Sequence, residues 1–157
     1  MNIKRILAIG MFSTVFYSNI ALSEGGKSLG LGAGSIYNGV GMSYGFQSHN
    51  QYKYASLGCL SITYSSTYGS ELNCGAGIGF VMTDIFNLKG NKHGFGAHLG
   101  VTYNEHYSKV ETFIAPHYVY YFNGINMSGW NLGGSLRLGK YDDKSDVIPN
   151  IQLGYQF

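Results

Sequence analysis

Apolar side chains recur at every second position along most of this chain, and this pattern restricts its fold more than any other feature. In residues 40–46, Val, Met, Tyr and Phe alternate with Gly and Ser, and in residues 75–82, Ala, Ile, Phe and Met alternate with glycines. A period of two is that of a β-strand with two different faces, and it does not fit the 3.6-residue period of a helix. The sequence therefore predicts an all-β protein.

The alternation can be followed through eight segments. It is clear in residues 40–46, 75–82, 94–103, 130–138 and 151–157. Three further segments have the composition of strands but a less certain facing, namely residues 29–36, 54–64 and 112–122. Stretches rich in Asn, Gly, Ser and Asp separate the segments, as expected of turns. Eight strands of about 10 residues suit a small membrane barrel. We therefore predict an eight-stranded antiparallel transmembrane β-barrel.

The N-terminal residues have the organisation of an export signal. Lys4 and Arg5 precede the mostly apolar run 6–17, and Ala21 and Ser23 are small residues at the positions that a signal peptidase reads. The run is shorter than the roughly 20 residues of a spanning helix. We expect residues 1–23 to be a cleaved signal peptide and residues 24–157 to form the barrel domain.

Charge is scarce and balanced in this chain. Charged residues make up 11% of it, well below the roughly 25% of an ordinary soluble domain. Without Lys4 and Arg5, the 10 basic residues fall to 8 against 8 acidic residues, so the predicted barrel domain is formally neutral. A neutral domain is not expected to attract nucleic acid.

The composition of the two strand faces distinguishes two kinds of barrel. One face is apolar and rich in Tyr and Phe, whereas the other carries mainly Gly, Ser, Asn and Gln with few charges. A soluble lipocalin-like barrel would put bulky apolar residues inside and charges outside. The observed faces favour a membrane barrel with a polar lumen and aromatic girdles. A sandwich or fibre subunit remains the alternative, since glycine-rich alternation also occurs there.

The C-terminus carries a family resemblance. Its last seven residues place Ile151, Leu153, Tyr155 and Phe157 at alternating positions, with Phe at the end. This resembles the assembly signal of Gram-negative outer-membrane β-barrels. With the signal peptide and the eight segments, the chain resembles the small OmpX and OmpA-transmembrane barrels. The resemblance implies the outer membrane as the location, its lipid as surroundings, and periplasmic chaperones and the barrel-assembly machinery as transient partners. We expect a monomer.

The two cysteines are expected to form a disulfide. Cys59 and Cys74 are the only cysteines, and an exported protein passes through an oxidising compartment. Their midpoint falls within residues 65–70, so a hairpin turning there places them opposite each other.

This pairing leaves the facing of residues 54–64 open. If Cys59 shares the outward facing of Cys74, then Leu60, Ile62 and Tyr64 point into the lumen. If these three residues point outward instead, the strand requires a bulge.

Several polar residues fall on the predicted lumen face. His98, His117 and Arg137 lie on successive strands, and Gln152 lies on the last one. We interpret them as a polar core that fills the barrel. The histidines are too scattered for a metal site, and no cofactor motif is present, so we expect neither metal nor cofactor.

These observations favour a structural or surface-interaction protein that is not a conducting pore, because eight strands enclose little more than their own side chains. Enzymatic activity is the alternative. Small outer-membrane barrels include enzymes that modify lipid A by acyl hydrolysis or transfer, and Glu105, His106 and Ser108 would be the candidate catalytic residues in an outer loop.

Overall fold

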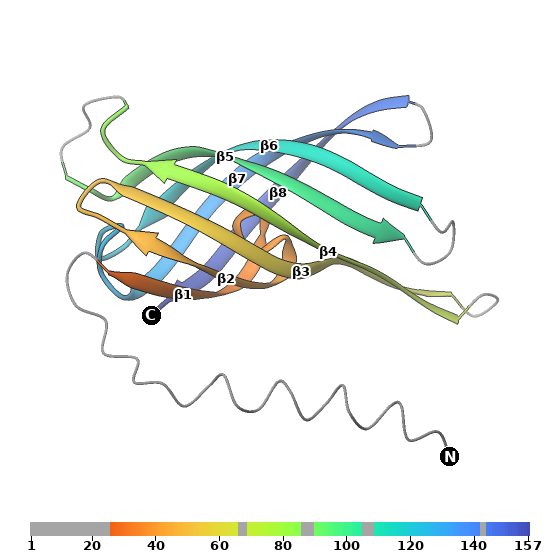
Figure 1. Cartoon of the computed structure of the whole chain (residues 1–157), viewed down its shortest axis with the longest axis horizontal. Helices are drawn as coiled ribbons and strands as arrows, with labels where there is room; N and C mark the ends of the chain where they lie inside the picture. The colour runs from red at the N-terminus through yellow and green to blue at the C-terminus, as the bar shows by residue number, and fades with distance from the viewer. Residues whose placement is uncertain (1–25, 66–68, 86–89, 105–108, 142–143) are drawn as a thin grey trace, which may run out of the picture.

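The computed structural model describes residues 26–65, 69–85, 90–104, 109–141 and 144–157. Its strands form one closed antiparallel barrel, in which each strand pairs with its neighbour in sequence and the first pairs with the last (Figure 1). The elements are β1 (Lys27–Gly34), the short 3-10 helix η3 (Ser35–Tyr37), β2 (Gly39–Gln47), β3 (Gln51–Ser65), β4 (Gly69–Met82), β5 (His93–Asn104), β6 (Lys109–Tyr121), β7 (Gly129–Tyr141) and β8 (Lys144–Gln156). The predicted all-β class, strand number and antiparallel topology are confirmed.

The barrel has two distinct ends. The start of β1 and the C-terminal Phe157 lie at one of them, here called the terminal end, where the Phe157 N–H donates to Leu29 O at 2.8 Å. The hairpins β3–β4, β5–β6 and β7–β8 project toward the opposite end, here called the hairpin end (Figure 1).

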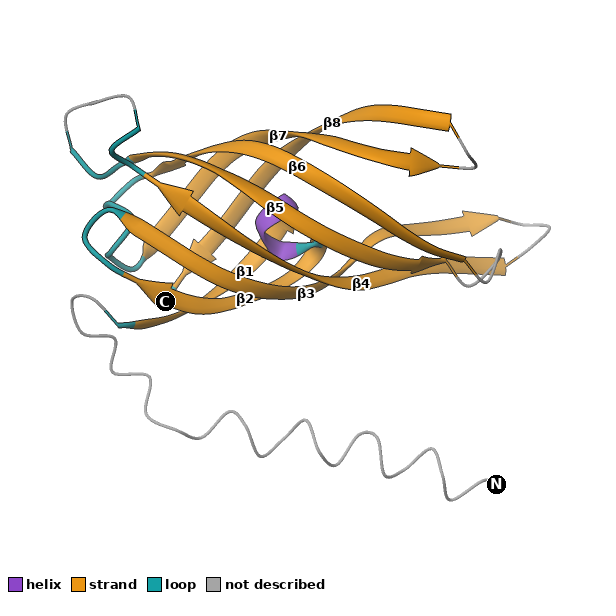
Figure 2. Cartoon of the chain, turned by 45° about the horizontal axis from the view of Figure 1, so that its top comes forward, coloured by secondary structure: helices purple, strands orange, loops and turns teal. Residues whose placement is uncertain are grey.

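The first hairpin differs from the prediction. Residues 29–36 were expected to form one strand, but β1 ends at Gly34 and the chain then turns into the barrel as η3 (Figure 2). Three residues around this turn have positive φ angles: Gly34 at 118°, Asn38 at 52° and Gly39 at 104°. Glycine and asparagine tolerate this region better than other residues, so the local sequence permits the turn.

The outer surface of the wall is apolar. Large hydrophobic side chains are exposed on every strand, for example Val40, Ile78, Leu99, Trp130 and Ile151. Aromatic residues gather at the terminal end, where Trp130 packs edge-on against Tyr155 and Tyr155 against Phe157, and where Tyr120 packs against Phe122. Among the residues that the structure describes, no helix is long and apolar enough to cross a membrane.

The interior is more aromatic than the sequence predicted. Tyr52 and Tyr54 on β3 and Tyr121 on β6 point inward and are at most 5% exposed. They form a buried cluster with Ile36, Tyr37, Val81, Val119 and Ile125. Glycines on neighbouring strands make room for the rings, since a Cβ at Gly79 would lie 2.4 Å from Tyr54 Oη. The expected Gly, Ser, Asn and Gln face is therefore only part of the lumen.

Candidate functional site

The short helix η3 closes the middle of the barrel. Ser35, Ile36 and Tyr37 are all buried, and Figure 2 shows the helix surrounded by the strands. The Tyr37 hydroxyl donates to Asn131 Oδ1 at 3.2 Å and accepts from Asn131 Nδ2 at 2.8 Å. The Ile36 N–H donates to Gln152 Oε1 at 3.4 Å. These contacts fix η3 to β7 and β8.

The hydroxyl groups of Ser35 and Ser135 add a further hydrogen bond between η3 and β7, at 2.5 Å. The fully buried Gln152 also donates from Nε2 to Asn131 Oδ1 at 3.4 Å. The side-chain amides of Gln152 on β8 and Asn131 on β7 are therefore hydrogen-bonded to η3 and to each other. These bonds spare Ser35, the Ile36 N–H and the Tyr37 hydroxyl the cost of burial without partners.

The two histidines predicted for the lumen are buried there with different partners. His98 on β5 is fully buried; its Nε2 lies 3.3 Å from Asn38 Oδ1 and its Nδ1 lies 3.4 Å from Tyr54 Oη. Its ring stacks on Tyr54 with an interplanar angle of 7°. His117 on β6 is 5% exposed and donates from Nδ1 to Ala115 O at 3.1 Å. Because His98 bonds to Asn38, it also helps to hold the end of η3.

Arg137 forms a separate cluster on the side of η3 toward the hairpin end. Its guanidinium carbon lies 4.1 Å from the centre of the Phe113 ring, a cation–π geometry. Its Nη2 donates to Thr102 Oγ1 at 3.5 Å and lies 3.9 Å from Glu111 Oε2. The Arg137 and Glu111 side chains remain 17% and 18% exposed, so this part of the interior is less completely filled than the tyrosine cluster.

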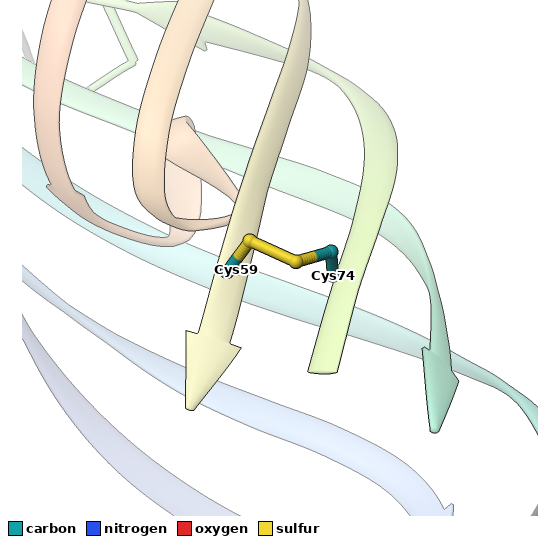
Figure 3. The surroundings of a disulfide bond; sticks show 2 residues. All are labelled: Cys59 and Cys74. Carbon is teal, nitrogen blue, oxygen red and sulfur yellow. A yellow bond between two sulfur atoms is a disulfide. The ribbon is translucent and has the colours of Figure 1, made fainter. Parts of the chain in front are cut away.

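Cys59 and Cys74 form a disulfide between β3 and β4, with an S–S distance of 2.08 Å (Figure 3). The two residues are directly paired in the ladder, and the register shifts between Cys59 and Ser61. This confirms the predicted disulfide. The shift is a bulge of the kind that one alternative required, but the side chains of Leu60, Ile62 and Tyr64 lie outside the described residues, and their facing stays a prediction.

Removal of this disulfide is expected to weaken the fold without preventing barrel formation. It closes a loop of 15 residues in sequence, which the chain-entropy model values at about 3 kcal/mol or less. Cys59→Ser with Cys74→Ser should therefore shift chemical unfolding to lower denaturant and still yield a folded barrel. Alkylation of the unreduced, denatured wild-type protein checks that the disulfide is present, since two modified thiols would show that no disulfide exists.

The residues of the predicted assembly signal lie on β8, which closes the barrel against β1, except for Phe157, which follows its last residue. Ile151, Leu153 and Phe157 are exposed, and Tyr155 is half-buried beside Trp130. The register pairs Leu153 with Ala33 and Tyr155 with Leu31. The alternating residues of the signal thus form part of the apolar outer surface at the closing seam.

The residues of the enzymatic alternative have no described geometry. Glu105, His106 and Ser108 lie outside the described residues, and the nearby Glu111 is engaged with Arg137. Within the ranges that the structure does describe, no group of three or more His, Cys, Asp and Glu side chains could hold a metal ion.

Sequence reasoning missed the inward turn of η3 and the aromatic part of the lumen. One signal was available: after Leu29, Leu31 and Ala33, the next apolar residues are the adjacent pair Ile36 and Tyr37, which break the alternation before an Asn-Gly turn. The inward facing of Tyr52, Tyr54 and Tyr121 had no such signal.

Comparison with known proteins does not assign the chain to a family. No family model matches it, and neither a curated protein nor a solved structure matches it.

Proposed function

We propose that this protein is a small barrel of the bacterial outer membrane with a structural or surface-interaction role, and that it does not conduct ions. The apolar outer wall supports a membrane location. Several large apolar side chains of the wall are 45 to 82% exposed, among them Phe46, Ile78, Leu132 and Ile151. Contact of this apolar surface with water is unfavourable, whereas contact with the hydrocarbon of a membrane is not. A closed sheet also satisfies backbone groups where lipid offers no partner.

The occluded interior carries the proposal that the barrel is not a pore. At the level of η3, Ile36 and Tyr37 meet Tyr52, Tyr54 and Tyr121, all of them at most 5% exposed. The polar atoms of η3 are bonded to the wall, so the helix is a fixed part of the core. Ions would have to displace this helix in order to pass.

The proposed route to the membrane follows from the same resemblance as the location. Residues 1–23 direct export, and the alternating C-terminal residues from Ile151 to Phe157 are recognised by periplasmic chaperones and the assembly machinery. Residues 153–156 pair with β1 at the seam that closes the barrel, so they have no β1 partner before closure, and this position suits a segment that is bound transiently at that stage. The mature protein is proposed to be a monomer in outer-membrane lipid.

Planar-bilayer recording tests the functional proposal. The wild-type protein should give no stable, large single-channel currents, because η3 and the tyrosine cluster fill the lumen. Stable, large conductance would contradict the proposal.

A second measurement separates the proposed role from enzymatic modification of lipid A. Mass spectrometry of lipid A from cells with and without the protein should show identical acyl chains. Loss or gain of one acyl group that disappears with His106→Ala would replace the proposal with the enzyme.

A further inference from the structure

The wall of the barrel is incomplete toward its hairpin end. β1 and β2 have only 8 and 9 residues, whereas the flanking strands β8 and β3 have 13 and 15. The β1–β8 ladder ends at the pair Ala33–Leu153, and the β2–β3 ladder ends at Val40–Cys59. β3 continues to Ser65 and β8 starts at Lys144, and in the described structure neither of these outer segments has a β1 or β2 partner.

This opening falls inside the apolar band of the wall. From Phe46 at the terminal end, β2 rises to Val40; at about 3.3 Å per residue and a tilt of about 40°, this spans about 15 Å of a band roughly 25 Å tall. Toward the hairpin end, the other strands still expose Val101, Ile114 and Leu138. The gap between β3 and β8 therefore faces hydrocarbon in the proposed orientation.

Ile148 shows that the interior is accessible at this gap. It pairs with the lumen-facing Arg137, and directly paired residues lie on the same face of a sheet, so Ile148 points inward. An inward isoleucine in a closed barrel would be buried, but Ile148 is 42% exposed. Ile148 is exposed because β1 ends before it reaches this part of β8 and leaves it without a neighbouring strand on that side.

Arg137 is the β7 partner of this isoleucine, and its guanidinium extends away from β8 across the interior, to Thr102 on β5 and to Glu111 and Phe113 on β6. An ionisable side chain at the depth of the apolar band faces a cavity and commonly marks a ligand or ion path. Its contacts to Thr102 at 3.5 Å and Glu111 at 3.9 Å are long compared with the roughly 2.8 Å of a charge-assisted hydrogen bond. The Phe113 ring lies against the guanidinium plane, so a carboxylate that displaces the long Nη2 contacts to Thr102 and Glu111 would meet an in-plane N–H edge that can donate two bonds.

Phe113 and the end of η3 lie close together on the side of Arg137 toward the terminal end. A Cβ at Gly100 would lie 2.4 Å from Phe113 Cζ and 2.8 Å from Asn38 Oδ1, so Phe113 packs beside the end of η3. A ligand entering from the side meets Arg137 and Phe113 and cannot pass η3 toward the terminal end.

We propose that the gap between β3 and β8 is a lateral opening that binds a single-chain amphiphile with a carboxylate head group, of the fatty-acid class. The carboxylate binds Arg137 inside the barrel, and the alkyl chain leaves over Ile148 into the surrounding lipid. The proposal rests on the proposed membrane location and adds a ligand to it. It requires no passage through the barrel and is compatible with a closed lumen.

Fluorescence quenching tests the lateral opening. The described residues contain no free cysteine, so Ile148→Cys adds a thiol that can be labelled with an environment-sensitive fluorophore. In phosphatidylcholine vesicles with spin-labelled acyl chains, this label should be quenched nearly as much as one at the lipid-facing Leu136→Cys. A label at Ser128→Cys, in the exposed β6–β7 turn, should be quenched by iodide added to the water and not by the spin-labelled acyl chains. If the label at position 148 behaves like that at position 128, no lateral opening exists.

Binding is tested with carboxyl-¹³C dodecanoate added to the protein in phosphatidylcholine nanodiscs. The wild type should give a carboxylate NMR signal distinct from that of dodecanoate in protein-free nanodiscs, and unlabelled dodecanoate, but not dodecan-1-ol, should remove it. Arg137→Gln should reduce the bound signal at least tenfold, whereas Lys53→Gln, which removes an exposed cation of β3, should leave it unchanged.

A bound signal of equal size in Arg137→Gln would mean partition into the bilayer only and would overturn the proposal. Both tests use protein already inserted in lipid. Failure to insert would therefore contradict the proposed location, whereas normal insertion without lipid quenching or without Arg137-dependent binding would contradict the lateral site alone.

Discussion

Tyr37→Ala is expected to lower the free energy of unfolding by about 4 kcal/mol, as large-to-small substitutions of buried aromatic residues do. Tyr37 is 1% exposed, and its ring lies against the backbone of β1 and β8, where a Cβ at Gly154 would be 2.4 Å from Cζ. The substitution also deprives Asn131 of both bonds to the hydroxyl. Urea unfolding in detergent micelles, followed by the fluorescence of Trp130, the single tryptophan, measures the change.

Two variants separate burial from other effects of this substitution. Tyr44→Ala removes the same side chain from an outward-facing, 49% exposed position on β2, and should cost no more than about 1 kcal/mol. Tyr37→Phe keeps the ring and should also cost about 1 kcal/mol, the usual value of the lost hydrogen bonds. Equal losses for Tyr37→Ala and Tyr44→Ala would show that η3 does not anchor the core.

Gly154→Val is expected to lower the stability of the barrel, whereas Gly134→Val is expected to leave it unchanged or to raise it slightly. At Gly154 a Cβ would lie 2.1 Å from Tyr37 Oη, and the ring is held by Asn131 and cannot move away without losing its bonds. Overpacking of this kind costs about 1–3 kcal/mol. At the outward Gly134, the nearest atom to a Cβ is Asn150 O at 3.5 Å, an ordinary contact, so valine should be neutral or slightly stabilising through its strand propensity.

A double-mutant cycle identifies the cause of the Gly154→Val effect. If contact with Tyr37 is responsible, Gly154→Val should cost much less in the Tyr37→Ala background, with an interaction energy of at least about 1 kcal/mol. An unchanged cost would place the strain elsewhere in β8. Unfolding midpoints of the four proteins give the answer.

The strands could be predicted from the sequence because residues along the wall of a barrel alternate between its two faces. Residues 40–46 and 130–138 alternate so regularly that only one facing is consistent with them. The disulfide was predictable for a similar reason, since Cys59 and Cys74 lie on either side of one predicted turn and pair directly across the β3–β4 ladder. In these segments the alternation of residues along the chain agrees with the face that each side chain takes in the barrel.

The lumen was less predictable because both faces of some strands carry bulky residues. On β6, Tyr118, Val119, Tyr120 and Tyr121 follow one another, and only the barrel as a whole decides which of them meet glycines across the lumen. η3 depends on partners distant in sequence, such as Asn131 and Gln152, whose roles no local pattern reveals. The incomplete wall beside β8 likewise follows from relative strand lengths and register.

Electrophoretic mobility with and without boiling tests the central claim, a closed barrel that resides in the membrane, most directly. Protein extracted in mild detergent from the outer-membrane fraction should run as a compact band when unheated and shift to the position of the unfolded chain after boiling, because the closed sheet resists the denaturing detergent until heated. Identical mobility in both lanes, together with recovery of the protein in the soluble periplasmic fraction, would contradict the account.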